Sequence, residues 1–198
     1  MINFSLLTHI KPIKLVVMLC LLTTLQGCVV ATVVAITAGT SIATDRRSVS
    51  HQIDDQRIEL HIYNEITRNK SLKDNTNVQI VSVNGAVLMI GQAPNTYLRD
   101  QLIKIANAVD GVVKIHNQVR IGNIISVTTQ SNDVWLTSKI KTALFSSKDV
   151  KGKSIKVVTE NAEVFLMGIV SKQEADAAID VTRNVSGINR VFNAFEYL

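Results

Sequence analysis

An internal repeat constrains this chain of 198 residues more than any other feature. From residue 54 onward the same order of patterns occurs twice, as in tandem copies of one small unit. Each copy opens on an aspartate, Asp55 or Asp133, followed by one apolar stripe at helical spacing. The stripe residues are Ile58, Ile62 and Ile66 in the first copy, and Leu136, Ile140 and Leu144 in the second. We therefore expect an amphipathic helix in each copy, opened and capped by its aspartate.

Two short β-runs follow each predicted helix and have the form of a hairpin. The runs are residues 78–83 with 86–90, and 155–159 with 164–167. Asn84-Gly85 between the first pair is a strong hairpin signal, because a type I′ turn needs positive φ at both central residues. Asn161-Ala162 is a weaker form of the same turn, because alanine tolerates positive φ less well than glycine.

A second helix and a last strand complete each copy. We expect the hairpins to end at Gly91 and Gly168, with an apolar periodicity of i, i+3 and i+7 predicting the helix that follows. The alternation of the last strands begins at Val113 in the first copy and includes Val191 in the second. The order α-β-β-α-β predicts an α+β fold in which each domain is a small three-stranded mixed sheet with two helices on one face. The domains would be residues 54–122 and 131–198, joined by a linker at 123–130.

Residues 1–27 are predicted to be a signal peptide. Lys11 and Lys14 precede an apolar run at 15–25, and a small residue stands at the expected cleavage point. Leu25-Gln26-Gly27-Cys28 resembles a bacterial lipobox, which implies that Cys28 is lipidated and becomes the new N-terminus. Residues 28–53 would then be the lipidated cysteine and a membrane-proximal tether. Two alternatives stay open: a single transmembrane anchor over 15–43, and a buried strand or small-residue packing stripe over 29–43.

These motifs together resemble the BON domain family. The residues that carry the resemblance are Asn84-Gly85, Gly91, Gly111-Val112 and Asn117 in the first copy, and Asn161, Gly168, Gly187-Ile188 and Asn193 in the second. Ala162 departs from the family pattern, in which glycine is usual. The resemblance implies two BON domains in a lipid-anchored protein of the Gram-negative outer membrane, facing the periplasm, where the domains contact phospholipid and support envelope integrity. The residue after Cys28 is Val29 rather than aspartate, which fits the sorting of such lipoproteins to the outer membrane.

Composition gives little support to catalysis or to nucleic-acid binding. The net charge of +5 falls to +3 once Lys11 and Lys14 are removed with the signal, a weak excess that does not by itself indicate nucleic acid. Of the two cysteines, Cys20 lies in the signal and Cys28 would be acylated, so no thiol remains for a metal or a nucleophile. The remaining histidines are scattered, and no hydrolase or phosphate-binding motif is present. We expect no enzyme and no cofactor beyond the covalent lipid.

The two copies differ most along their first helices. Trp135 is the only tryptophan, and Arg57 occupies its place in the first copy. Residues 139–156 hold six lysines against one acid, whereas the matching stretch of the first copy is close to neutral. Indole prefers the head-group boundary of a bilayer, and cations are attracted to anionic lipid. The predicted membrane-binding residues are Trp135, Ser138, Lys139, Lys141, Thr142, Lys148 and Lys151. The alternative is that Trp135 packs under the linker or the sister domain and that the lysines form a solvated face.

These patterns favour a membrane-binding function. The expected partner is anionic phospholipid of the outer membrane, bound by the second domain. The alternative is a protein-binding adaptor for outer-membrane assembly machinery or cell-wall remodelling enzymes, including proteins that regulate amidases, with Trp135 and the exposed part of the first sheet as its contact surface. A sensor that binds a small molecule between the domains is a third class, for which no pocket residue is identifiable.

Overall fold

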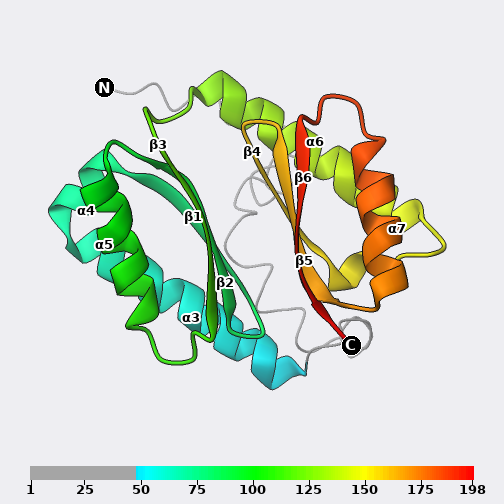
Figure 1. Cartoon of the computed structure of the whole chain (residues 1–198), viewed down its shortest axis with the longest axis horizontal. Helices are drawn as coiled ribbons and strands as arrows, with labels where there is room; N and C mark the ends of the chain where they lie inside the picture. Colours follow the sequence, from blue (N-terminus) through cyan, green and yellow to red (C-terminus); the bar gives the residue numbers. More distant parts are fainter. Residues whose placement is uncertain (1–47) are drawn as a thin grey trace, which may run out of the picture. The chain divides into compact units, whose positions relative to one another are not determined.

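The computed structural model describes residues 48–198. The first domain contains α3 (Val49–Arg68), α4 (Lys70–Asn75), β1 (Asn77–Val83), β2 (Ala86–Ala93), α5 (Thr96–Asn107) and β3 (Lys114–Ile121). The second contains α6 (Val127–Ser146), the 3-10 helix η2 (Gly152–Ser154), β4 (Lys156–Glu160), β5 (Glu163–Val170), α7 (Lys172–Arg183) and β6 (Arg190–Tyr197) (Figure 1). The predicted signal peptide at 1–27, Cys28 and most of the predicted tether lie outside the described residues.

Each domain is built on a three-stranded mixed sheet. β1 pairs with β2 antiparallel and β2 with β3 parallel, and β4, β5 and β6 repeat this order. In Figure 1, α3 and α5 cover one face of the first sheet, and α6 and α7 cover one face of the second. The predicted α-β-β-α-β fold is confirmed, and the short α4 and η2 are additions that the periodicity did not predict.

The second strand of each hairpin continues past its glycine. β2 runs to Ala93 and β5 to Val170, so the prediction that these strands end at Gly91 and Gly168 is wrong. Both positions require glycine because backbone atoms of a neighbouring segment lie where a side chain would begin. A Cβ at Gly91 would lie 2.0 Å from the Asn77 carbonyl oxygen, and one at Gly168 would lie 2.3 Å from a backbone oxygen.

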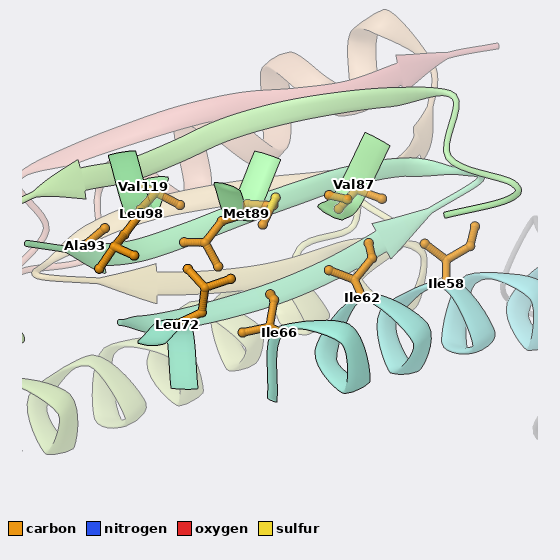
Figure 2. Packing of buried hydrophobic residues seen from close by; sticks show 11 residues of the cluster. Ile58, Ile62, Ile66, Leu72, Val87, Met89, Ala93, Leu98 and Val119 are labelled. Atoms are coloured by element: carbon orange, nitrogen blue, oxygen red, sulfur yellow. The ribbon is translucent and has the colours of Figure 1, made fainter. Parts of the chain in front are cut away.

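The apolar stripe of each first helix faces its sheet. Figure 2 shows Ile58, Ile62 and Ile66 of α3 pointing toward Val87 and Met89 of β2. The second domain repeats this core, in which Leu136, Ile140 and Leu144 are buried together with Val164 and Leu166. Burial of these side chains is the main stabilising term for each domain.

Both first helices begin before their aspartates. The Ser48 side chain caps α3 and the Ser126 side chain caps α6, each by accepting a backbone hydrogen bond. The prediction that Asp55 and Asp133 open and cap these helices is therefore wrong. Residues 49–53, assigned to the tether, and 127–130, assigned to the linker, are helical.

Asp55 holds the turn of the first hairpin. Its carboxylate is only 2% exposed and accepts hydrogen bonds from the Ser82 hydroxyl (2.7 Å), the Asn84 N–H (2.9 Å) and the Gly85 N–H (3.0 Å). Asn84 and Gly85 have φ of 52° and 76°, as a type I′ turn requires. A buried carboxylate with these donors ties helix α3 to the β1–β2 turn.

Asp133 has the same role in the second domain. It accepts hydrogen bonds from the N–H groups of Asn161 (2.7 Å) and Ala162 (2.8 Å). These two residues have φ of 51° and 59°, so the weaker sequence forms the same turn. Two charge-assisted hydrogen bonds offset the strain of alanine in the left-handed region.

Replacing Ala162 by glycine is expected to stabilise the chain by about 0.5–1 kcal/mol. The left-handed conformation costs alanine about 1–2 kcal/mol, which glycine avoids. The greater conformational entropy of glycine in the unfolded chain offsets part of this gain. Urea unfolding measures the free energy directly. Gly85→Ala is the matched opposite change and should destabilise, because its Cβ would lie 2.6 Å from the Gly111 carbonyl oxygen. A less stable Ala162→Gly variant would contradict the assignment of strain to this turn.

The sheet faces turned away from the helices pack against each other. They form one buried apolar cluster of Val81, Val83, Leu88 and Ile90 from the first sheet with Val158, Phe165 and Met167 from the second. The Phe165 ring stacks on Phe192 with centroids 4.6 Å apart. The first sheet is therefore covered on both faces. The predicted adaptor contact on the exposed part of this sheet stays a prediction, and these buried positions do not belong to it.

Polar contacts also join the two domains. Lys156 Nζ lies 2.9 Å from Glu59 Oε1 and donates to the Ser82 carbonyl oxygen at 2.9 Å. The other contacts are the Arg120–Glu163 ion pair, the hydrogen bond from Gln92 to Glu160, and the hydrogen bonds from Asn84 to Glu196. Lys156, counted above within the lysine run, thus belongs to the contact between the domains.

Glu160 is expected to make stability fall with rising pH. Burial raises the pKa of its carboxyl group above the ordinary value, and the hydrogen bond from Gln92 opposes this in part. The folded chain then holds a proton on Glu160 at pH values where the unfolded chain has lost it. The contribution is therefore most favourable below the unfolded pKa and is lost as pH rises through the folded pKa. Glu160→Gln should gain stability relative to the parent between acidic and neutral pH, measured by urea unfolding. A constant difference would contradict this.

Candidate functional site

Trp135 lies on the outer side of α6 and is 56% exposed. The Lys139 ammonium stands 4.3 Å from the centroid of its ring and donates a hydrogen bond of 3.4 Å to the Ser186 carbonyl oxygen. Residues four apart on a helix are neighbours, which brings the cation over the ring face. Lys139 therefore braces Trp135 in an exposed position, so the alternative in which Trp135 packs under the linker or the sister domain does not hold.

Trp135 and Lys139 border a shallow hollow of about 560 Å³. Its helix side is completed by Ser138, Thr142 and Ala143, and its other side by Asn184, Val185 and Ser186 after α7. The hydroxyl protons of Ser138 and Thr142 are donated to backbone carbonyls four residues earlier, at 3.0 and 2.9 Å. These hydroxyl oxygens remain available as acceptors, while the Lys139 ammonium has further donors.

The structure divides the predicted lysine cluster. Only Lys139 lines the hollow; Lys141 lies on another side of α6, in a groove bordered by β1 and β4. Lys148 and Lys151 are exposed in the loop that follows α6. Of the seven predicted site residues, Trp135, Ser138, Lys139 and Thr142 are brought together, and the other three lysines do not line the hollow.

Phe145 is an exposed aromatic residue that the sequence reasoning missed. It is 56% exposed near the end of α6. A Cβ at Gly152 would lie 2.9 Å from its ring, so the lysine-bearing loop folds back against Phe145. The available signal was its place directly after the core residue Leu144, where the helical period turns a side chain toward solvent. Val134, also exposed, adds to this apolar side of α6.

The corresponding surface of the first domain has different chemistry. A hollow of about 1150 Å³ beside α3 contains Arg57 and Arg68. Arg57 lies 3.7 Å from Asp54, and Arg68 forms an ion pair with Glu65. No large aromatic ring lines this hollow among the described residues. Because the fold is the same, the exposed tryptophan of the second domain and the lysine beside it are not demanded by the fold.

The remaining titratable groups offer little reactive chemistry. Burial, with a smaller effect of nearby Lys114, lowers the pKa of His116 on β3. Within residues 48–198, histidines and acids form no group of three that could hold a metal ion. In the same part of the chain, no helix has the length and apolar character needed to cross a bilayer. The surface around Trp135 is thus the most distinctive site of the described chain.

Comparison with known proteins matches both halves of the chain to one family. The family model described as BON domain matches residues 54–123 and 132–198. The chain is 37% identical over 185 residues to Outer membrane lipoprotein DolP of Haemophilus influenzae, covering 93% of this chain and 96% of that protein. It is 39% identical over 154 residues to the 21 kDa hemolysin of Actinobacillus pleuropneumoniae, covering 78% and 79%. It is 24% identical over 159 residues to Osmotically-inducible protein Y of Escherichia coli, covering 79% of each.

Proposed function

The chain belongs to the BON domain family as a dual-domain lipoprotein of the outer membrane, and we propose that its second domain binds the surface of an anionic bilayer. The family assignment confirms the resemblance found in the sequence motifs. The proposed activity is binding without catalysis, in support of envelope integrity. The protein would be held by its lipid at Cys28 and oriented by α6.

The observation that carries this proposal is the exposed Trp135 ring braced by Lys139. A large aromatic ring held outward in water exposes apolar surface that would be buried at the head-group boundary. The Lys139 ammonium next to the ring would meet lipid phosphate at the same depth. The Ser138 and Thr142 hydroxyl oxygens could accept hydrogen bonds from head-group donors.

The surroundings of the hollow support the same orientation. Phe145 would enter the bilayer boundary together with Trp135. Lys148 and Lys151 stand in the loop beside Phe145 and would add electrostatic attraction of roughly 1 kcal/mol each near an anionic surface. Lys141 would act from the side of the helix. The second contact is not needed for retention, because two lipid chains already anchor a protein stably. It would instead set which face of the protein meets the bilayer.

Replacing Trp135 by glutamate is expected to weaken binding to anionic vesicles by roughly 10- to 100-fold, since a buried aromatic side chain is worth about 1.5–3 kcal/mol and 1.4 kcal/mol is a factor of ten. Co-sedimentation of a fragment covering residues 44–198, which form one compact unit without the lipid anchor, measures this. Tyr97→Glu is the matched control, because Tyr97 is an exposed aromatic residue of the first domain. Unchanged affinity of the Trp135→Glu variant would overturn the proposal.

Salt and lipid composition separate membrane binding from a protein-binding adaptor. Binding through lysines should weaken as ionic strength rises and should be lost on zwitterionic vesicles. Fluorescence of Trp135, the only tryptophan, should shift to shorter wavelength on addition of anionic vesicles. Fluorescence that stays constant, with no vesicle binding at low salt, would instead favour a protein partner at this surface.

A further inference from the structure

Helix α3 carries a second apolar stripe that the fold does not bury. Its buried face holds Ile58, Ile62 and Ile66, whereas Val49, Ile53, Leu60 and Tyr63 are each about half exposed. With Gln56 and Thr67 these four residues follow one line along the helix at alternating steps of four and three. None of the six positions of this α3 stripe is charged. From Val49 to Tyr63 the stripe is roughly 20 Å long, at 1.5 Å per residue.

The second domain shows that the fold does not require apolar residues at three positions of this stripe. α6 has the same place in its domain, and the positions matching Ile53, Leu60 and Tyr63 are Ser131, Ser138 and Lys141. The other stripe positions, Val49, Gln56 and Thr67, match Val127, Val134 and Phe145, so the two helices place their exposed apolar residues differently along the same line. Large exposed apolar groups that packing does not explain mark an interaction surface.

The charge of α3 argues against a lipid bilayer as the partner. The helix contains four acids and two arginines. Both arginines lie beside acids, Arg57 3.7 Å from Asp54 and Arg68 paired with Glu65. An anionic membrane would therefore not attract this helix as it would the lysines of the second domain. The uncharged α3 stripe, beside arginines that are already paired with acids, fits the apolar stripe of another helix.

We propose that the α3 stripe pairs in parallel with the same helix of a second copy of this chain. The four–three spacing is that of a two-stranded coiled coil, with Ile53 and Leu60 at one core position of the heptad and Val49 and Tyr63 at the other. Gln56 and Thr67 also lie within the seam, and polar residues at core positions favour the register in which each meets its own copy across the pair. In this register, position 59 falls opposite Asn64 of the second copy and Gln52 falls opposite Arg57. Glu59 is held by Lys156 within its own chain, so no like charges oppose each other.

Anchoring of both copies in one membrane would allow such a small interface to form. One helix pair buries less surface than the roughly 1,200 Å² of weak interfaces, so the pairing would be weak in dilute solution. Copies anchored in one bilayer face the same way and share a thin layer, which raises their effective concentration. The pairing does not depend on lipid binding by α6, and the two proposals can fail separately.

Thiol crosslinking of the full lipid-anchored chain tests the pairing. With Cys20 in the predicted signal and Cys28 the predicted site of acylation, Ile53→Cys and Leu60→Cys would each supply one free thiol. With a short homobifunctional thiol reagent in native membranes, both variants should give a crosslinked dimer. Ser131→Cys and Ser138→Cys place a thiol at the matching sites of α6 and should give only the background of random collisions.

A second variant removes two apolar residues of the stripe with substitutions that the same fold already carries in the second domain. Leu60→Ser with Tyr63→Lys introduces the residues that α6 carries at these positions. Added to Ile53→Cys, it should abolish the crosslinked dimer while vesicle binding through Trp135 stays unchanged. Equal crosslinking at the α3 and α6 positions, or a dimer that persists in the stripe variant, would overturn the proposal. So would crosslinks of Ile53→Cys to other proteins alone, or quenching of a probe at residue 60 by brominated lipid.

Discussion

Replacing Asp55 by alanine is expected to destabilise the protein by about 3–5 kcal/mol, since hydrogen bonds to a charged acceptor are worth about 1.5–3 kcal/mol each and their loss leaves buried donors unsatisfied. The Asp55 carboxylate accepts from the Ser82 hydroxyl and from two backbone N–H groups of the hairpin turn. No other side chain in the turn offers a carboxylate at that place. The change removes the link between α3 and the β1–β2 hairpin as well as the bonds themselves. Urea unfolding measures the loss.

The neighbouring Asp54 provides the control for Asp55. Asp54 is well exposed and stands 3.7 Å from Arg57, so Asp54→Ala should change stability by less than about 0.5 kcal/mol. Asp55→Asn keeps the size of the side chain and one acceptor oxygen, and it should fall between the two. Equal effects of Asp54→Ala and Asp55→Ala would show that the buried carboxylate does not hold the turn.

Asp55 also shows which parts of the structure can be predicted from short sequence patterns and which cannot. Apolar periodicity correctly predicted the helices, hairpins and mixed sheets, because each domain has one buried face per helix. The role of Asp55 did not follow from local rules. An aspartate before an apolar stripe has the form of an N-cap, and only the tertiary fold brings Ser82 and Gly85 to its carboxylate. Ser48, the actual cap, lies in a stretch without periodicity.

The contact between the sheets was present in the sequence but ambiguous. Residues 87–90 and 164–167 are continuous apolar runs rather than alternating ones, which indicates a strand buried on both faces. The same runs fit a single-faced strand with chance apolar neighbours, and nothing local identifies the second sheet as the cover. The contact from Lys156 to Glu59 links residues far apart in the chain, which periodicity cannot detect.

The surface around Trp135 was predictable to the extent that one helix carries it. Trp135, Ser138, Lys139 and Thr142 meet because helical spacing brings them together. Phe145 was missed because it follows the last core residue of α6, and its approach to Gly152 depends on a loop. Lys141 lies apart from Lys139 because lysines close in sequence point to different sides of a helix.

Replacing Leu88 by alanine in the first domain is expected to lower the unfolding midpoint reported by Trp135 in the second. Leu88 is fully buried in the cluster between the sheets, where such a truncation costs about 2–5 kcal/mol. The cluster buries apolar side chains from the hairpins of both domains, so unfolding of one domain would expose those of the other to water. Far-UV circular dichroism and Trp135 fluorescence should therefore report one coincident urea transition, in the parent and in the Leu88→Ala variant alike.

Leu60→Ala is the matched control for Leu88→Ala, because the Leu60 side chain is exposed on α3 and lies outside both cores and the contact between the sheets. It should leave the Trp135 midpoint almost unchanged. A Leu88→Ala variant in which circular dichroism shows an early transition while Trp135 keeps its parent midpoint would show two independent domains. If the domains unfold together, the second domain alone would leave Phe165 and Met167 uncovered and would be less stable. An isolated second domain should then lose anionic vesicle binding even though its Trp135 and lysines are intact.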